Sequence, residues 1–365
     1  MAVLTALFIV YFLLIAVMLA GWNRAMQPRS DAVRAKEPLI SVIIPVRNEE
    51  MTIGSLLTDL SHQEYRNFEI IVVNDDSEDE TLWMVSRYDM KNLRAIHSKG
   101  RGKKAAITAG VRAAKGGIIV TTDADCAVSP EWLNQIRAQF SNPRVMMAFG
   151  GVRMEGDDSF FHSLQAMEFS SLIGTGASTA ALGFPTICNG ANLAFRKKAF
   201  TAVKGYEGNL QIASGDDEFL MRKIQKVYPG GILFLNSPEG IVTTRSQSDP
   251  EAFLNQRIRW ASKWRYNTSL LAQCLAVLVV LFQAAFIINW FFVFTPLILQ
   301  ALFFMAVKMI LEAALLLQVC RFLRTPWNWL AFFALQFCYP LYVIAVAAAS
   351  FFRPFRWRNR IFKPF

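Results

Sequence analysis

An uncharged apolar run at the start of the chain, VLTALFIVYFLLIAVMLAGW over residues 3–22, restricts the possible folds more than any other feature. About 20 apolar residues span the hydrocarbon core of a bilayer, so the run predicts a transmembrane anchor within residues 1–23. A cleaved signal peptide is the weaker alternative, because no Lys or Arg precedes the run and its length exceeds the apolar core of such peptides. Basic residues follow directly and place the next part of the chain in the cytoplasm by the positive-inside rule: Arg24, Arg29, Arg34 and Lys36.

Three further apolar segments, at 270–288, 290–320 and 327–352, predict transmembrane or interfacial helices within residues 267–352. The breaks are expected at Asn289–Trp290 and at 321–329. Lys308 and Glu312 lie four residues apart inside the second segment. An ion pair that neutralises itself along a helix is the favoured interpretation, and a functional polar patch near a lipid headgroup is the alternative.

The basic tail at 353–365 conflicts with a simple topology, because three crossings after a cytoplasmic domain would place it outside. Two alternatives remove the conflict: one C-terminal segment is interfacial or re-entrant, or the long second segment crosses twice. With either one, we expect a multi-pass protein of the cell (inner) membrane with residues 39–266 in the cytoplasm.

Composition agrees with a membrane protein that carries a soluble part. The 365 residues are 53% hydrophobic and 18% charged, which excludes intrinsic disorder, and five Cys are too few for a disulfide scaffold. The net charge of +10 indicates an anionic partner such as lipid headgroups or phosphates. Nucleic acid is not expected, because the basic residues flank apolar segments rather than form an aromatic-interleaved patch.

Residues 39–266 have the pattern of an α/β domain. Short β-branched runs at 39–45, 68–74 and 117–122 predict buried parallel strands, and helical segments separate them. This alternation predicts a mostly parallel sheet covered on both faces, with ligands bound at the carboxyl ends of the strands.

Polar residues stand at those predicted strand ends. Asp75 could accept a hydrogen bond from a base or ribose, and Lys103, behind two glycines at a helix start, could meet a phosphate. Asp123 and Asp125 would point to one side of an extended strand end and suit Mg²⁺ or Mn²⁺ carrying a diphosphate. A simple acidic turn is the alternative. The sequence has neither a Walker A loop nor a GxGxxG motif after the first strand.

Acidic and basic motifs follow later in the domain. Asp216 and Asp217 open a predicted helix, where they serve either as helix-start charges or as a general base. Gln256-Arg-Ile-Arg-Trp260 precedes the membrane segments and could alternatively be a basic amphipathic helix on anionic lipid.

Taken together, these residues resemble a family 2 inverting glycosyltransferase of the GT-A type. Five motifs occur in family order: PVRNEE at Pro45, NDDSEDET at Asn74, GKKAAITAG at Gly102, DAD at Asp123, and GDDEFL followed by QRIRW. One departure is that the usual DDGS is Asn74-Asp75-Asp76-Ser77 here. The resemblance implies a GT-A Rossmann-like nucleotide-sugar-binding domain flanked by transmembrane α-helices.

The resemblance also implies a role for each matching position. The donor would contact Pro45, Glu49, Asp75, Lys103 and Asp123, with Asp125 as the ligand of a divalent metal, Mg²⁺ or Mn²⁺. Asp217 would be the catalytic base, with Asp216 as its neighbour and the alternative choice. The acceptor and diphosphate end of the cleft would be lined by Asn189, Gln256, Arg259 and Trp260.

The expected activity is transfer of a hexose from a UDP-sugar to a membrane lipid by single displacement with inversion. A processive polysaccharide synthase with a glycan acceptor is the first alternative, because QxxRW beside membrane helices also occurs in such enzymes. A non-catalytic membrane scaffold is the second, although a scaffold has no use for acids clustered at strand ends.

Overall fold

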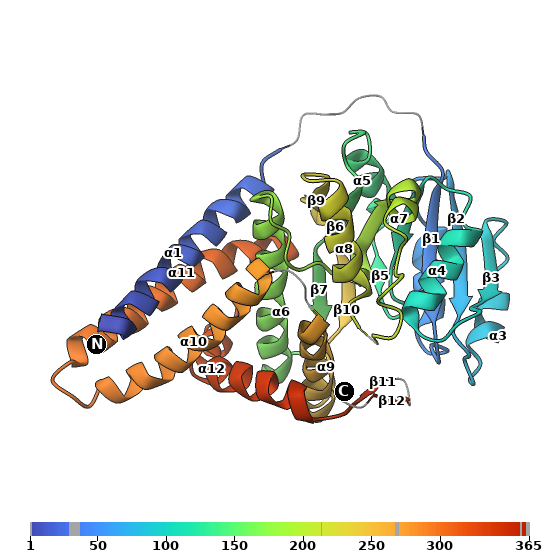
Figure 1. Cartoon of the computed structure of the whole chain (residues 1–365). Coiled ribbons are helices and arrows are strands. Elements are labelled where there is room, and N and C mark those ends of the chain that lie inside the picture. The colour runs from blue at the N-terminus through green and yellow to red at the C-terminus, as the bar shows by residue number, and fades with distance from the viewer. Residues whose placement is uncertain (1, 29–36, 213, 267–269, 358–359, 363–365) are drawn as a thin grey trace. The chain divides into compact units, whose positions relative to one another are not determined.

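The computed structural model describes residues 2–28, 37–212, 214–266, 270–357 and 360–362 (Figure 1). Its contacts divide the chain into two compact units. The helical unit comprises Met1–Trp22, Gly156–Gly174 and Ser246–Phe365, and the sheet unit comprises Asn23–Glu155 and Thr175–Arg245. The boundaries predicted at residues 39, 266 and 352 remain a prediction.

The sheet unit is built on a seven-stranded, mostly parallel sheet in the order β3-β2-β1-β4-β8-β6-β9. Only β8 runs against its neighbours β4 and β6. This confirms the predicted α/β class. The strands are β1 (Ile40–Val46), β2 (Phe68–Asn74), β3 (Leu93–His97), β4 (Ile118–Thr121), β6 (Met147–Gly150), β8 (Leu193–Arg196) and β9 (Ile232–Leu235).

Apolar side chains explain why these segments form the core. Every residue of β2 is buried, as expected for a β-branched run that is covered on both faces. On α2 (Ile53–Ser61) the buried residues Leu56, Leu57 and Leu60 share one face. The other helices of the unit are α3 (Thr81–Ser86), α4 (Lys103–Ala113), α5 (Trp132–Gln139), α7 (Lys197–Ala202) and α8 (Asp216–Val227). A second, three-stranded sheet joins β5 (Ala127–Val128), β10 (Val242–Arg245) and β7 (Val152–Glu155).

The strand order decides where the candidate site lies. Strand β1 lies between β2 and β4 and runs parallel to both, so the three carboxyl ends meet at one edge of the sheet. The loops that begin at Arg47, Asp75 and Thr122 therefore start next to one another.

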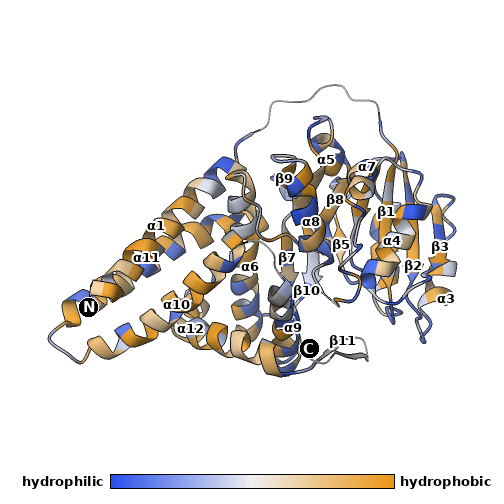
Figure 2. Cartoon of the chain, viewed as in Figure 1, coloured by the Kyte–Doolittle hydropathy of each residue, from blue (hydrophilic) through white to orange (hydrophobic). Residues whose placement is uncertain are grey.

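Within its described residues, the helical unit contains four helices that are long and apolar enough to cross a membrane. They are α1 (Ala2–Ala25), α10 (Leu270–Phe292), α11 (Ile298–Leu323) and α12 (Trp329–Phe352), and Figure 2 shows apolar residues along most of their length. Because α11 is one continuous helix, the expectation that this segment could cross twice is wrong. Of the flanking basic residues, Arg29, Arg34 and Lys36 lie outside the described residues, as do residues 358–359 and 363–365 of the tail.

The break predicted at Asn289–Trp290 is also wrong, because α10 continues through both residues to Phe292. The chain turns instead at Thr295 and Pro296, and a proline there cannot supply an N–H to continue the helix. Asn289 is tolerated inside the helix because its buried side-chain amide donates to the backbone carbonyl of Ala301, 3.1 Å away.

The charged pair predicted on α11 forms, and it belongs to a larger polar network. The ammonium of Lys308 donates to Glu312 at 2.9 Å and to the side-chain oxygen of Gln336, on α12, at 2.6 Å. Tyr11, on α1, donates its hydroxyl to the other carboxylate oxygen of Glu312 at 2.5 Å. The network therefore satisfies the buried charges and joins α1, α11 and α12.

Two further helices belong wholly or partly to the helical unit. Helix α6 (Phe160–Ala181) contributes its first residues to this unit, and α9 (Pro250–Ser262) lies within it. Glu168 and Arg257 form an ion pair with 2.6 Å between Oε2 and Nη2, and both side chains are buried. The unit ends with the short hairpin β11 (Phe355–Trp357) and β12 (Arg360–Phe362).

Candidate active site

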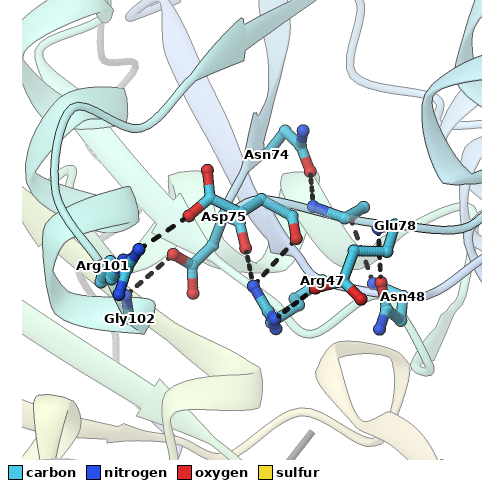
Figure 3. A network of polar contacts seen from close by, with 9 residues as sticks. Arg47, Asn48, Asn74, Asp75, Glu78, Arg101 and Gly102 are labelled. Atoms are coloured by element: carbon cyan, nitrogen blue, oxygen red, sulfur yellow. Dashed lines mark hydrogen bonds and ion pairs between the residues drawn. The ribbon is translucent and has the colours of Figure 1, made fainter. Parts of the chain in front are cut away.

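Arg47, the first residue after β1, organises the loop that leaves β2 (Figure 3). Its buried guanidinium donates from Nη1 to the backbone carbonyls of Asp75 and Asp76, both at 2.8 Å. Its Nη2 forms an ion pair with Glu78 at 3.2 Å. Arg47 therefore fixes the position of the loop backbone next to the end of β1.

Asn48 and Asn74 complete this network. The N–H of Glu78 donates to Oδ1 of Asn48 at 2.9 Å, and the N–H of Ser77 donates to Oδ1 of Asn74 at 3.0 Å. Asp76 stands where the resembling family carries Gly, and it adopts the left-handed region with φ of 55°. Asp is one of the few side chains that accept this conformation, so the loop keeps its turn without glycine.

Asp75 connects this loop to the start of α4. Its side chain is 3% exposed, and Oδ1 accepts a hydrogen bond from the backbone N–H of Gly102 at 2.9 Å (Figure 3). Gly102 has φ of +90°, a conformation that favours glycine, and it directly precedes the first residue of α4. The Asp75 carboxylate thereby sets the position of Lys103.

Lys103 is the centre of the charge cluster in the sheet unit. Its Nζ lies 2.6 Å from Oδ1 of Asp123, after β4, and 3.4 Å from Oδ2 of Asp216, on α8. The Lys103 side chain is 19% exposed and that of Asp216 is 13% exposed, so water screens the contact only in part. Three segments that are distant in the sequence thus place charges of opposite sign together.

The pKa values of the cluster reflect this arrangement. Burial lowers the pKa of the Lys103 ammonium, but the negative charges of Asp123, Asp216 and Asp217 outweigh burial and hold this pKa above its ordinary value. For Asp216 the signs are opposite: burial raises the pKa, and the charges of Lys103 and Lys104 outweigh it and lower the pKa. Lys103 and Asp216 are therefore both charged at neutral pH in the free protein.

Gly190 lies against the acid pair. Its backbone N–H donates to Oδ2 of Asp217 at 3.1 Å, and its carbonyl accepts from the Thr121 hydroxyl at 3.0 Å. A Cβ atom at this position would lie 3.0 Å from Oδ2 of Asp216 and 3.3 Å from Nζ of Lys103. A larger residue would therefore fit here only if these two side-chain ends moved by a few tenths of an ångström.

The segment from Asp123 to Cys126 is a turn, and the expectation of an extended strand end is wrong. Strand β4 stops at Thr121, and the N–H of Cys126 donates back to the carbonyl of Asp123 at 3.2 Å. Burial and the charges of Asp123 and Asp125 raise the pKa of the Cys126 thiol well above its ordinary value. The Cys126 thiol therefore stays protonated at neutral pH.

Other predicted residues have structural contacts of their own. Pro45 lies in β1, and the side chain of Glu49 accepts from the Thr52 hydroxyl at 2.8 Å, within the loop between β1 and α2. Asn189 caps the short 3-10 helix Gly190–Asn192 by accepting from the N–H of Ala191 at 2.9 Å.

The predicted residues Gln256, Arg259 and Trp260 lie on α9, in the helical unit. Their part in the site remains a prediction. Within that unit, the guanidinium of Arg257 lies over the Trp260 ring, 4.4 Å from its centroid, and donates to the side-chain oxygen of Gln256.

Sequence reasoning missed three residues that organise the site. Arg47 and Gly190 have been described, and Lys104, which stands in the GKKAAITAG motif without a role of its own, is the third. A weak signal existed for Arg47, because an arginine directly after a buried strand is unusual unless it is paired. No local pattern identifies Gly190, because its requirement arises from residues far away in the sequence.

Part of the chain is similar to a known protein family. Residues 41–203 match the family model described as "Glycosyl transferase family 2". This range contains β1 from Ser41 onward, β2, β4 and the Lys103–Asp123 pair.

Curated relatives cover different parts of the chain. A poly-beta-1,6-N-acetyl-D-glucosamine synthase of Staphylococcus epidermidis is 23% identical over 287 residues, which are 74% of this chain and 66% of the synthase. An undecaprenyl-phosphate 4-deoxy-4-formamido-L-arabinose transferase of Pseudomonas fluorescens is 34% identical over 107 residues, which are 27% of this chain and 32% of that transferase. Neither match reaches two thirds of the relative's length.

Among solved structures, the mannosyltransferase PcManGT from Pyrobaculum calidifontis, in complex with GDP-Man and Mn²⁺, superposes with a TM-score of 0.62. The match covers 96% of this chain and 98% of that one at 19% identity. At this identity the likeness supports the fold alone.

Proposed function

The chain carries a glycosyltransferase family 2 domain, and from this premise we propose that it transfers one hexose from a UDP-sugar to a membrane lipid. The observation that carries the proposal is the Lys103 cluster at the strand ends, where one ammonium lies against Asp123 and Asp216. A leaving diphosphate needs positive charge held in place before it departs, and a preorganised ammonium supplies it.

The donor would bind at the edge of the sheet where β1, β2 and β4 end. Glu49 and Asp75 belong to the loops around Arg47, and Pro45 lies at the end of β1, so these residues would frame the nucleotide. Lys103 and Asp123 would face the ribose or the diphosphate. The fixed loop backbone reduces the ordering that donor binding requires.

A divalent metal fits the residues after β4. Among the described residues, no group of three or more His, Cys, Asp or Glu side chains could hold a metal without further ligands. Mg²⁺ and Mn²⁺ sites often use only one or two carboxylates and take their remaining oxygens from substrate phosphate and water. Asp125, assisted by Asp123, would hold the ion, which when bound neutralises charge on the diphosphate.

Asp217 would act as the base. Its Oδ2 accepts a hydrogen bond from the N–H of Gly190, which orients the carboxylate. Asp217 would form no covalent bond with the sugar. As the acceptor hydroxyl attacks the anomeric carbon, its proton would pass to Asp217, and the bond from that carbon to the phosphate oxygen would break. The electron pair leaves with the diphosphate, and a single displacement inverts the anomeric centre.

A lipid acceptor is favoured by the four apolar helices of the helical unit. A relative named for undecaprenyl phosphate supports the same choice. The family resemblance assigns the acceptor end to Gln256, Arg259, Trp260 and Asn189, and this assignment stays a prediction. The sheet unit would face the cytoplasm of a multi-pass inner-membrane protein, as expected when basic residues follow the first apolar helix.

A processive synthase remains the second candidate function, because a relative of that name aligns with 74% of the chain. Both candidates place donor chemistry in the sheet unit and differ in the product. The non-catalytic scaffold loses support from the family 2 match.

A donor panel with purified protein tests the proposal. UDP- and GDP-hexoses are offered with and without a membrane lipid extract and divalent metal, and release of nucleoside diphosphate is measured. We expect release from one UDP-hexose that depends on both metal and lipid, with one sugar added per lipid. A ladder of products would favour the processive synthase. No release from any donor would contradict glycosyl transfer.

A further inference from the structure

Lys104, the neighbour of the charge-cluster lysine, has its ammonium buried under backbone carbonyls. Its side chain is only 4% exposed, and Nζ donates to the carbonyl oxygens of Asn209 at 2.9 Å, Ile212 at 2.8 Å and Ser214 at 3.0 Å. The ring of Phe219, on α8, lies 4.7 Å from Nζ. An ammonium has three N–H groups, and three carbonyls receive them.

All three carbonyls belong to one segment, residues 203–215, which connects α7 to α8 and which we call the 203–215 loop; residue 213 is outside the described part. The loop ends at Asp216, so its last residues determine where the acid pair begins. Its described backbone bonds are short-range, such as the N–H of Ile212 to the carbonyl of Asn209 at 3.2 Å. Lys104 therefore links the second half of the loop to α4.

The two adjacent lysines at the start of α4 thus have different partners. Successive residues of a helix point in directions about 100° apart, so the side chains of Lys103 and Lys104 leave α4 on different sides. Lys103 contacts Asp123 and Asp216, whereas Lys104 contacts the loop that carries Asp216 and Asp217. The start of α4 therefore contacts Asp123 and Asp216 through Lys103 and the loop that leads to Asp216 through Lys104.

We propose that Lys104 is a positioning residue that holds the 203–215 loop against α4, so that Asp217 stays beside Gly190 and within reach of an acceptor hydroxyl. Lys104 itself touches neither donor nor acceptor. The inference rests on the proposed function, in which Asp217 is the base. A misplacement of about 1 Å in a reacting group can reduce a rate by roughly 10²-fold, which sets the scale of the expected effect.

The test compares Lys104→Ala with Lys223→Ala. Lys223 supplies the matched control, because its Nζ also donates to two carbonyls of the same loop, Gly205 at 2.8 Å and Glu207 at 2.7 Å. These carbonyls belong to the first half of the loop, which is farther along the chain from Asp216 and Asp217. We expect Lys104→Ala to lower kcat by roughly 10²-fold with donor KM near the parent value. Lys223→Ala should keep kcat close to that of the parent.

Hydrogen exchange and chemical rescue separate positioning from general damage. In Lys104→Ala the amides of residues 209–212 should exchange faster, while those of β1 and β2 keep their protection. The truncation leaves room for n-propylammonium, which replaces the lost atoms and charge and should restore part of both kcat and loop protection. The uncharged n-propanol should restore neither. Lys104→Gln, which keeps two N–H donors, should fall between parent and Lys104→Ala.

The outcomes are distinct. Parent-like kcat and loop exchange in Lys104→Ala would overturn the proposal, and so would an equal loss of kcat in Lys223→Ala. Unfolding of both Lys104 variants without recovery in n-propylammonium would also overturn it, because Lys104 would then support the whole fold. Absence of turnover in the parent would contradict the proposed function instead, and the exchange measurement would still show whether Lys104 holds the loop.

Discussion

The carboxylate of Asp217 accepts a hydrogen bond from the backbone N–H of Gly190, with 3.1 Å between the two atoms. Asp216, one residue earlier, lies 3.4 Å from the ammonium of Lys103 instead. Two adjacent acids on one helix start therefore have different partners, and this difference supports different roles for them.

We predict that Asp217→Asn binds donor as the parent does but has a kcat lower by roughly 10²–10⁴-fold, because asparagine cannot take up the acceptor proton. Asp216→Asn should lose less activity, because its carboxylate pairs with a lysine. Calorimetric donor binding beside steady-state kcat for both variants is the measurement. If Asp216→Asn were the inactive variant and Asp217→Asn stayed active, the base assignment would be displaced by one residue.

Asp125→Asn should weaken donor binding that depends on metal, while the protein stays folded. Asparagine keeps the size of the side chain and loses the charge that a divalent ion needs. We expect the affinity for Mn²⁺ to fall by at least roughly 10–100-fold, which is the loss that outer-shell changes cause at metal sites. Mn²⁺ titration followed by electron paramagnetic resonance, in the presence of UDP, measures it. Parent-like Mn²⁺ affinity would show that the metal ligand lies elsewhere.

Gly190→Ala should reduce kcat by less than the roughly 10²-fold that a 1 Å misplacement causes, because the added Cβ would shift the side-chain ends of Asp216 and Lys103 by a few tenths of an ångström. Gly117→Ala is the matched control, since a Cβ at Gly117 meets nothing within 4 Å. Both kcat and thermal unfolding should be measured for the two variants. Equal activity in the two would mean that the cluster tolerates the shift and that its geometry is not critical.

Glu69 gives the fold a pH dependence that can be measured. Its carboxylate accepts from the Ser41 hydroxyl and the Lys115 N–H, both at 2.6 Å, and pairs with Arg94 at 3.0 Å. Burial raises the pKa of Glu69, but these contacts outweigh burial and lower it. A lowered folded-state pKa stabilises the fold above the ordinary value of 4.5, and this stabilisation is lost as the pH falls through the folded-state value.

We therefore predict that Glu69→Gln lowers the free energy of unfolding by about 1.5–3 kcal/mol at neutral pH, as for hydrogen bonds to charged groups. The gap between parent and variant should narrow as the pH falls below 4.5. Denaturant unfolding in detergent at several pH values provides the measurement. If the difference in unfolding free energy between parent and variant stayed constant from neutral to acid pH, the pKa of Glu69 would not be lowered in the folded protein.

Local sequence patterns were sufficient for the elements that carry the site. Buried β-branched runs predicted β1 and β2, and the acids of Asp216-Asp217 predicted the start of α8, because burial and helix-start charge are local properties. The parallel order of the strands followed from strand–helix alternation. The metal, base and acceptor roles drawn from the family resemblance remain predictions.

Features that depend on distant partners could not be predicted. The polarity of Asn289 indicated a helix break, but a carbonyl on the next helix satisfies its amide. The carbonyls around Lys104 come from more than 100 residues later in the chain, beyond the range of local sequence patterns.

The anomeric configuration of the lipid product tests the central claim most directly. Purified protein is incubated with an α-configured UDP-hexose, metal and lipid extract, and the product extracted into organic solvent is analysed by proton NMR and mass spectrometry. Single displacement onto a lipid predicts one added sugar in β linkage. An α linkage, a polymer, or lipid without sugar would contradict the account.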